Sequence, residues 1–80
     1  MDLEVLRQIV IKWRDANLTR ITDCPGEAKV ITGNLKIDAM LYHFEQDSGI
    51  ELKLSPPFSK ISGCNIVDEK KCSWFVLRWA

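Results

Sequence analysis

The sequence has no excess of either charge, because eleven lysines and arginines balance eleven aspartates and glutamates. A neutral chain without a charged tail is poorly suited to hold duplex nucleic acid or an anionic membrane through bulk electrostatics. No apolar run approaches the roughly 18–20 residues that span a bilayer. Glu4, Arg7 and Gln8 also interrupt the N-terminal segment that a secretory signal peptide would need. These absences predict a cytoplasmic protein with no membrane partner.

Cysteine and histidine are few and widely spaced. The cysteines are Cys24, Cys64 and Cys72, and His43 is the only histidine. No two cysteines have the short spacing with which one turn presents two ligands to zinc. Cys64 and Cys72 flank a candidate hairpin, but an odd number of cysteines without a signal peptide is typical of reduced thiols. We therefore predict no metal, no cofactor and thiols that pack as small apolar side chains.

Local motifs of common catalytic sites are also absent. The sequence contains no GxxxxGK[ST] phosphate loop, no GxGxxG dinucleotide loop and no HExxH zinc motif. The acidic residues are scattered singly apart from Asp68-Glu69, which has the character of a solvated turn. A cysteine paired with His43 is a weaker hypothesis, since catalytic partners meet in space and not in sequence. We predict that the protein is not an enzyme.

Residues 2–17 have the pattern of an amphipathic helix. At about 100° per residue, their apolar side chains fall in one arc of roughly 160°. Asp2 can accept a backbone N–H at the helix start, and Asn17 can end the helix. Such a helix must lay its apolar arc on a core. The arc comprises Leu3, Val5, Leu6, Ile9, Val10, Trp13 and Ala16.

Most of the remaining chain has the short apolar runs and turn signals of β-strands. Pro25-Gly26 and Gly33-Asn34 indicate turns, the second of them a two-residue hairpin. Gln46-Asp47-Ser48-Gly49 is typical of a type I turn that ends in a left-handed glycine. Pro56-Pro57 should stop a strand and start an extended loop through Phe58. The strand candidates are residues 28–32, 35–46, 50–54, 61–67 and 73–79.

Residues 35–46 fit a helix as well as a strand. As a helix they collect Ile37, Met40, Leu41 and Phe44 in one stripe, and several of their residue types favour helix. We favour the strand because the segment lies between two predicted turns. The predicted fold class is α+β, a single domain over residues 1–80. In it, one N-terminal amphipathic helix (about 2–17) packs on an antiparallel meander of four to five strands in a β-rich region (about 28–80).

Two groups of residues are candidates for binding a partner. As a strand, residues 73–79 are bulky on both faces, so one helix would leave a face for a partner or a second copy. The alternative is that residues 35–46 form a helix and cover that face. Separately, the polar side of the N-terminal helix carries a small basic and apolar patch suited to an acidic partner or a phosphate. The candidate binding residues are Trp74, Val76, Arg78 and Trp79 in the first group and Arg7, Ile11 and Arg14 in the second.

These features favour a small protein that acts by binding another protein, as an inhibitor, an adaptor or a regulatory subunit. An inhibitor of a larger host complex, of the kind that phages and plasmids encode, would have this size and this lack of motifs. A homodimer is a further expectation. The alternative is a nucleic-acid-binding module that uses the arginines of the helix or Lys70-Lys71 near Trp74. It is less favoured because Asp68 and Glu69 accompany these lysines.

Overall fold

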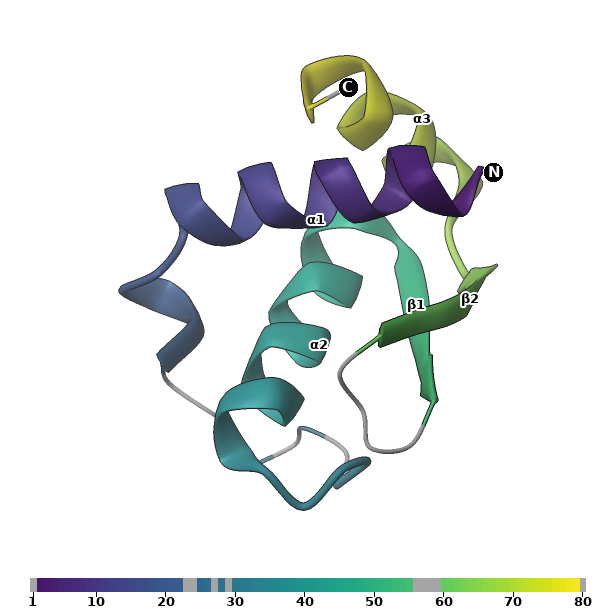
Figure 1. The fold of residues 1–80 in the computed structure, drawn as a ribbon. Helices are drawn as coiled ribbons and strands as arrows, with labels where there is room; N and C mark the ends of the chain where they lie inside the picture. Colours follow the sequence, from purple (N-terminus) through teal and green to yellow (C-terminus); the bar gives the residue numbers. More distant parts are fainter. Residues whose placement is uncertain (1, 23–24, 27, 29, 56–59, 80) are drawn as a thin grey trace.

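The computed structural model describes residues 2–22, 25–26, 28, 30–55 and 60–79. Within this part the fold is α+β, with three α-helices and one antiparallel pair of strands (Figure 1). The predicted meander of four to five strands is therefore wrong, and two of the three helices lie in the region predicted as β-rich. The elements are α1 (Leu3–Ala16), the short 3-10 helix η1 (Arg20–Thr22), α2 (Leu35–Ser48), β1 (Ile50–Ser55), β2 (Lys60–Ile66) and α3 (Glu69–Trp79).

Helix α1 confirms the predicted N-terminal amphipathic helix. The Asp2 carboxylate accepts the Glu4 backbone N–H at 2.8 Å and so caps the first turn. Asn17 ends the helix as expected, although its φ of −125° is not left-handed. Leu6, Ile9, Val10 and Trp13 of the predicted arc are buried, whereas Val5 at its edge is exposed. The local pattern was sufficient to place this helix and its inner face.

Helix α2 replaces the strand that we predicted for residues 35–46. The Asn34 side chain accepts the backbone N–H groups of Lys36 and Ile37, at 3.0 and 3.3 Å, so Gly33-Asn34 leads into a helix cap and not a hairpin. The helix continues through the segment expected to form a turn and ends at Gly49, whose φ is +68°. Only the left-handed glycine of that predicted turn is confirmed, as the C-cap of a helix.

The segment before α2 is organised by the buried carboxylate of Asp38. This group accepts the backbone N–H and the hydroxyl of Thr32, each at 2.9 Å, and the N–H of Ile31 at 3.4 Å. Burial by itself would raise the pKa of Asp38, but these hydrogen bonds outweigh it and lower that pKa. The described residues 28 and 30–32 form no strand, so the strand predicted for 28–32 is wrong there.

Two of the strand predictions, 50–54 and 61–67, are confirmed by β1 (Ile50–Ser55) and β2 (Lys60–Ile66). The strands pair antiparallel, with Ile50 opposite Ile66 and Leu52 opposite Cys64, and the register is irregular between Lys53 and Leu54. Ile50 and Leu52 point into the core, as their alternation with charged residues predicted. The loop expected over residues 56–58 lies outside the described residues.

Helix α3 replaces both the strand predicted for residues 73–79 and the turn before it. Asp68 precedes the helix and its carboxylate accepts the Lys71 backbone N–H at 3.1 Å, so the turn residues form a helix start. The backbone carbonyl of Gly49 accepts the N–H groups of Val67 and Asp68, which ties the start of α3 to the end of α2. A strand would have placed the bulky side chains of this segment on two opposite faces. On the helix they lie instead on one face that points inward and one that points outward.

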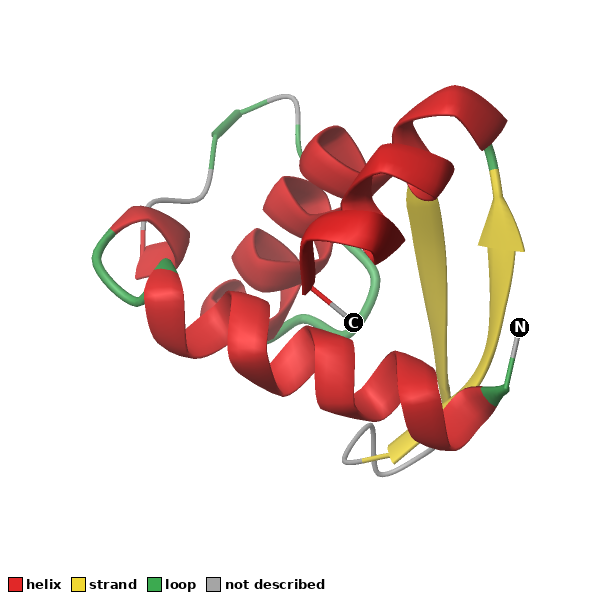
Figure 2. Cartoon of the chain, turned by 90° about the horizontal axis from the view of Figure 1, so that it is seen from above, coloured by secondary structure: helices red, strands yellow, loops and turns green. Residues whose placement is uncertain are grey.

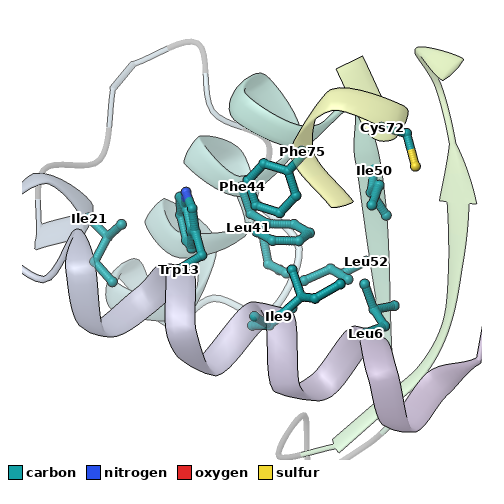
Figure 3. Close-up of a cluster of buried hydrophobic side chains, with 11 residues drawn as sticks. Leu6, Ile9, Trp13, Ile21, Leu41, Phe44, Ile50, Leu52, Cys72 and Phe75 are labelled. Atoms are coloured by element: carbon teal, nitrogen blue, oxygen red, sulfur yellow. The ribbon is translucent and has the colours of Figure 1, made fainter. Parts of the chain in front are cut away.

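The core lies between the three helices and the strand pair, which stands at one edge of the helices in Figure 2. Phe44 is at its centre (Figure 3), with ring centroids 5.1 Å from Trp13 and 5.2 Å from Phe75, both edge to face. None of the helices in the described part of the chain is both long and apolar enough to cross a membrane. The buried cluster is Leu6, Ile9, Val10, Trp13, Ile21, Leu41, Phe44, Ile50, Leu52, Cys72 and Phe75.

Candidate functional site

The outer side of α3 carries two large apolar side chains in water. Trp74 is 76% exposed and Leu77 is 78% exposed, and they are neighbours on the helix because they are three residues apart. Lys70 lies one turn before Trp74 and Arg78 one turn after it. We call these four residues the α3 face. Adjacent exposed apolar side chains bordered by charge are typical of a binding surface.

An open cleft of about 740 Å³ adjoins the α3 face. It lies where α3 meets the end of α1, the helix η1 and the end of α2. Four cationic side chains line it, and its aromatic lining comes from three tryptophans and one phenylalanine. We call it the basic cleft. Its lining residues are Trp13, Ala16, Asn17, Arg20, Gln46, Asp47, Asp68, Lys70, Lys71, Trp74, Phe75, Arg78 and Trp79.

One of the two carboxylates of the basic cleft, that of Asp47, accepts three hydrogen bonds from internal partners. Its two oxygens accept hydrogen bonds from the Arg20 guanidinium at 2.6 Å each, and the Trp13 indole N–H donates to it at 3.0 Å. Partial burial would raise the pKa of Asp47, but the bonds from Arg20 and Trp13 lower it, and the same contact raises the pKa of Arg20. The pair therefore stays ionised at neutral pH and fixes η1 against α1 and α2.

The other charges of the basic cleft leave it with an excess of available cations. Asp68 caps α3 through one oxygen and remains an exposed carboxylate. Lys71 donates one hydrogen bond to the Gln46 carbonyl at 3.1 Å, and the Arg78 guanidinium lies 5.5 Å from the centre of the Trp79 ring. Lys70 and Arg78 form no ion pair with another described residue. The cleft therefore has two more cationic than anionic side chains, which favours an incoming anion.

The structure brings together only part of the first predicted group of binding residues. Trp74 and Arg78 lie on the α3 face and also line the basic cleft. Trp79 lines the cleft too, but it is half-buried with its ring 6.1 Å from that of Phe75. Val76 is half-buried against the core and lines neither surface. Helical spacing in residues 69–79 would have added Leu77 to the predicted binding residues. A strand places Leu77 on the face opposite Trp74.

Arg20 is a cationic residue of the cleft that the sequence did not indicate as a binding residue. It follows α1 in a stretch whose turn signals indicate only a connection, and its position depends on Asp47, which is 27 residues later. The second predicted group, Arg7, Ile11 and Arg14, lies away from the cleft and lines a separate groove.

The two described cysteines and the histidine lie on three different elements, β2, α3 and α2. Cys64 and Cys72 are free thiols. They do not flank a hairpin, because Cys64 lies on β2 and Cys72 lies on α3. Cys24 lies outside the described residues. Burial raises the pKa of the Cys72 thiol, which lowers its reactivity. His43 contacts the Tyr42 ring at 5.4 Å between centroids. Among the residues whose positions are described, no three His, Cys, Asp or Glu side chains are grouped to hold a metal ion.

Comparisons of the chain with protein-family models, with curated proteins and with solved structures find no match. No relative therefore supplies an activity or a partner for this chain.

Proposed function

We propose that this protein acts by binding another protein through the α3 face and the basic cleft. The observation that carries the proposal is the exposure of Trp74 and Leu77 side by side. Burying a leucine-sized side chain contributes roughly 1.5–3 kcal/mol, and folding leaves this contribution unused on α3. Tryptophan and arginine are also the residue types that most often dominate the energy of an interface.

The chemistry of the partner follows from the charges around these side chains. Lys70 and Arg78 flank the apolar pair, and the cationic side chains of the basic cleft outnumber its carboxylates by four to two. A partner segment that carries carboxylates beside an apolar residue would complement both properties. An inhibitor, an adaptor and a regulatory subunit would all act through such a contact.

The proposal is tested by retention of a partner on tagged variants. Trp74→Ala and Arg78→Glu should each abolish capture of a stoichiometric protein from native lysate and of the same protein after purification. The thermal midpoint should stay nearly unchanged, because both side chains are exposed. Leu35→Ala is the matched control, since Leu35 is 71% exposed but lies at the start of α2. Equal capture by Trp74→Ala, or loss of its fold, would contradict the proposal.

A second candidate function is binding of single-stranded nucleic acid in the basic cleft. It is favoured by the grouping of Lys70, Lys71 and Arg78 with exposed Trp74, because such grooves combine cations with stacking aromatic rings. It predicts quenching of tryptophan fluorescence by oligothymidylate, with affinity that falls steeply as salt increases. No binding at about 50 mM salt would exclude it. A captured protein that survives nuclease treatment would favour protein binding instead.

A further inference from the structure

A second groove, which shares no lining residue with the basic cleft, lies between α1, α2 and the strand pair. Its volume is about 560 Å³, within the range of roughly 300–1,000 Å³ that is usual for small-molecule sites. We call it the lateral groove. Its floor is aliphatic and is formed by Val10, Ile11, Ile37, Met40, Leu54 and Ile61.

The floor of the lateral groove is an extension of the core to the surface. Ile37, Met40, Leu54 and Ile61 each pack against the core and each remain partly exposed. Ile11 is 42% exposed on the otherwise polar side of α1. The groove thus explains why this isoleucine lies outside the buried stripe of its helix.

The only charges that line the lateral groove, among the described residues, are the three cations Arg7, Arg14 and Lys60. Arg7 is held in place, because its guanidinium donates to the Ile61 carbonyl at 3.1 Å and pairs with Glu4 at 3.5 Å. Arg14 pairs only with its exposed neighbour Asp15, at 3.6 Å, and such pairs contribute little. Lys60 has no ion pair with any residue that the structure describes. Arg14 and Lys60 are therefore available to an incoming anion.

The lining also restricts the kind of ligand. Apart from the three cations, the described lining residues carry no hydroxyl, amide or aromatic side chain. Outside its cations, the described lining offers no side-chain group to hydrogen-bond a sugar or peptide and no aromatic ring to stack on a base. It complements an unbranched aliphatic chain that ends in an anion.

We propose that the lateral groove binds a fatty acid, with the hydrocarbon chain on the aliphatic floor and the carboxylate on Arg14 and Lys60. The two cations would form charge-assisted hydrogen bonds to the carboxylate, while the floor excludes water from the chain. This site is independent of the α3 face, so either function can be present without the other.

The experiment compares three probes that share a chain and differ in the head group: dodecanoate, dodecanol and dodecylamine. Each is titrated into the full chain below its critical micelle concentration and followed by calorimetry and by the Met40 methyl resonance. Dodecanoate should bind at one site with the highest affinity, dodecanol more weakly and dodecylamine most weakly. Equal affinity of dodecanoate and dodecylamine, or no saturable binding of dodecanoate, would overturn the proposal.

Charge-reversal variants locate the head group. Arg14→Glu and Lys60→Glu should each weaken dodecanoate binding about tenfold and leave dodecanol unchanged. Lys12→Glu is the matched control, because Lys12 is an exposed cation of the same helix that does not line the groove. If Lys12→Glu weakens binding as much as Arg14→Glu, only the overall charge matters and the site is refuted.

Other occupants of the groove give distinct results. Ile11→Asn should remove dodecanoate binding without changing the oligomeric state. A dimer that dissociates in Ile11→Asn would assign the groove to a second copy of the chain and overturn the proposal. So would binding of an acidic amphipathic peptide at Met40 without any binding of dodecanoate.

Discussion

Trp13 is the residue whose removal should be most informative about how this fold is held together. It is 1% exposed, packs edge to face on Phe44 at 5.1 Å, and donates its indole N–H to Asp47 at 3.0 Å. Trp13→Ala removes the ring through which α1 packs on Phe44 of α2. The loss of the apolar packing of the ring and the cavity that remains should together cost about 3–5 kcal/mol.

The hydrogen bond adds less to that cost than its charged acceptor would suggest. Asp47 keeps both bonds from Arg20 when the indole is gone, so its carboxylate is not left unpaired. We therefore expect only about 1 kcal/mol from this bond. The stability reserve of a domain of this size is often only about 3–5 kcal/mol, so Trp13→Ala should be largely unfolded at room temperature.

The assay is urea denaturation followed by far-UV circular dichroism, with sulfate added so that the weakened variant can be measured. Trp13→Phe is the control, because phenylalanine fills most of the space but cannot donate to Asp47. It should lose about 1–2 kcal/mol. A loss below about 1 kcal/mol for Trp13→Ala would show that α1 does not pack through this face, since a buried large-to-small change costs more.

Two further predictions concern pH and backbone geometry. The folded pKa of Asp47 lies below its unfolded value, so the stability it contributes is complete above the unfolded pKa of about 3.9 and is lost as pH falls through the folded pKa. Thermal melts of wild type and Asp47→Asn should therefore differ by a constant amount between about pH 5 and 7 and converge below about pH 4, whereas a difference that persists in acid would contradict the assigned pairing with Arg20. Gly33→Ala and Gly49→Ala both place a side chain at positive φ, at a cost of about 1 kcal/mol each. Gly49→Ala also creates a steric clash, because its new Cβ would lie 2.6 Å from the Asp68 carbonyl oxygen, whereas the Cβ at Gly33 would meet no atom within 4 Å. Chemical denaturation should show the larger loss for Gly49→Ala, and equal losses would mean that α3 can shift away from Gly49.

The sequence indicated the residue types of the candidate binding surface more reliably than it indicated where those residues lie in the structure. Trp74 and Arg78 stand out in the sequence as bulky and charged, and the structure leaves both on the surface. The sequence did not indicate which residues lie beside them. Arg20 reaches the same cleft only because Asp47 holds it, and no local pattern connects two residues so far apart. Leu77 is expected beside Trp74 only when the segment is interpreted with a helical period.

The sequence by itself determined the elements whose signals are local and have one interpretation. In α1 the apolar residues follow a helical period and no other, and Asp2 and Asn17 mark the ends with their own side chains. In β1 the alternation of Ile50 and Leu52 with charged residues is equally unambiguous.

Only the tertiary structure decided the state of residues 35–48 and 69–79. Each of these segments places its apolar residues acceptably with a period of 2 or of 3.6, and their boundary residues suit both a turn and a helix cap. Phe44 packs between Trp13 and Phe75, which come from the two ends of the chain, so a helical face at each segment completes one core. The helices form because they allow distant segments to bury their apolar side chains together. Local sequence preference does not decide between helix and strand here, because a strand would satisfy that preference almost as well.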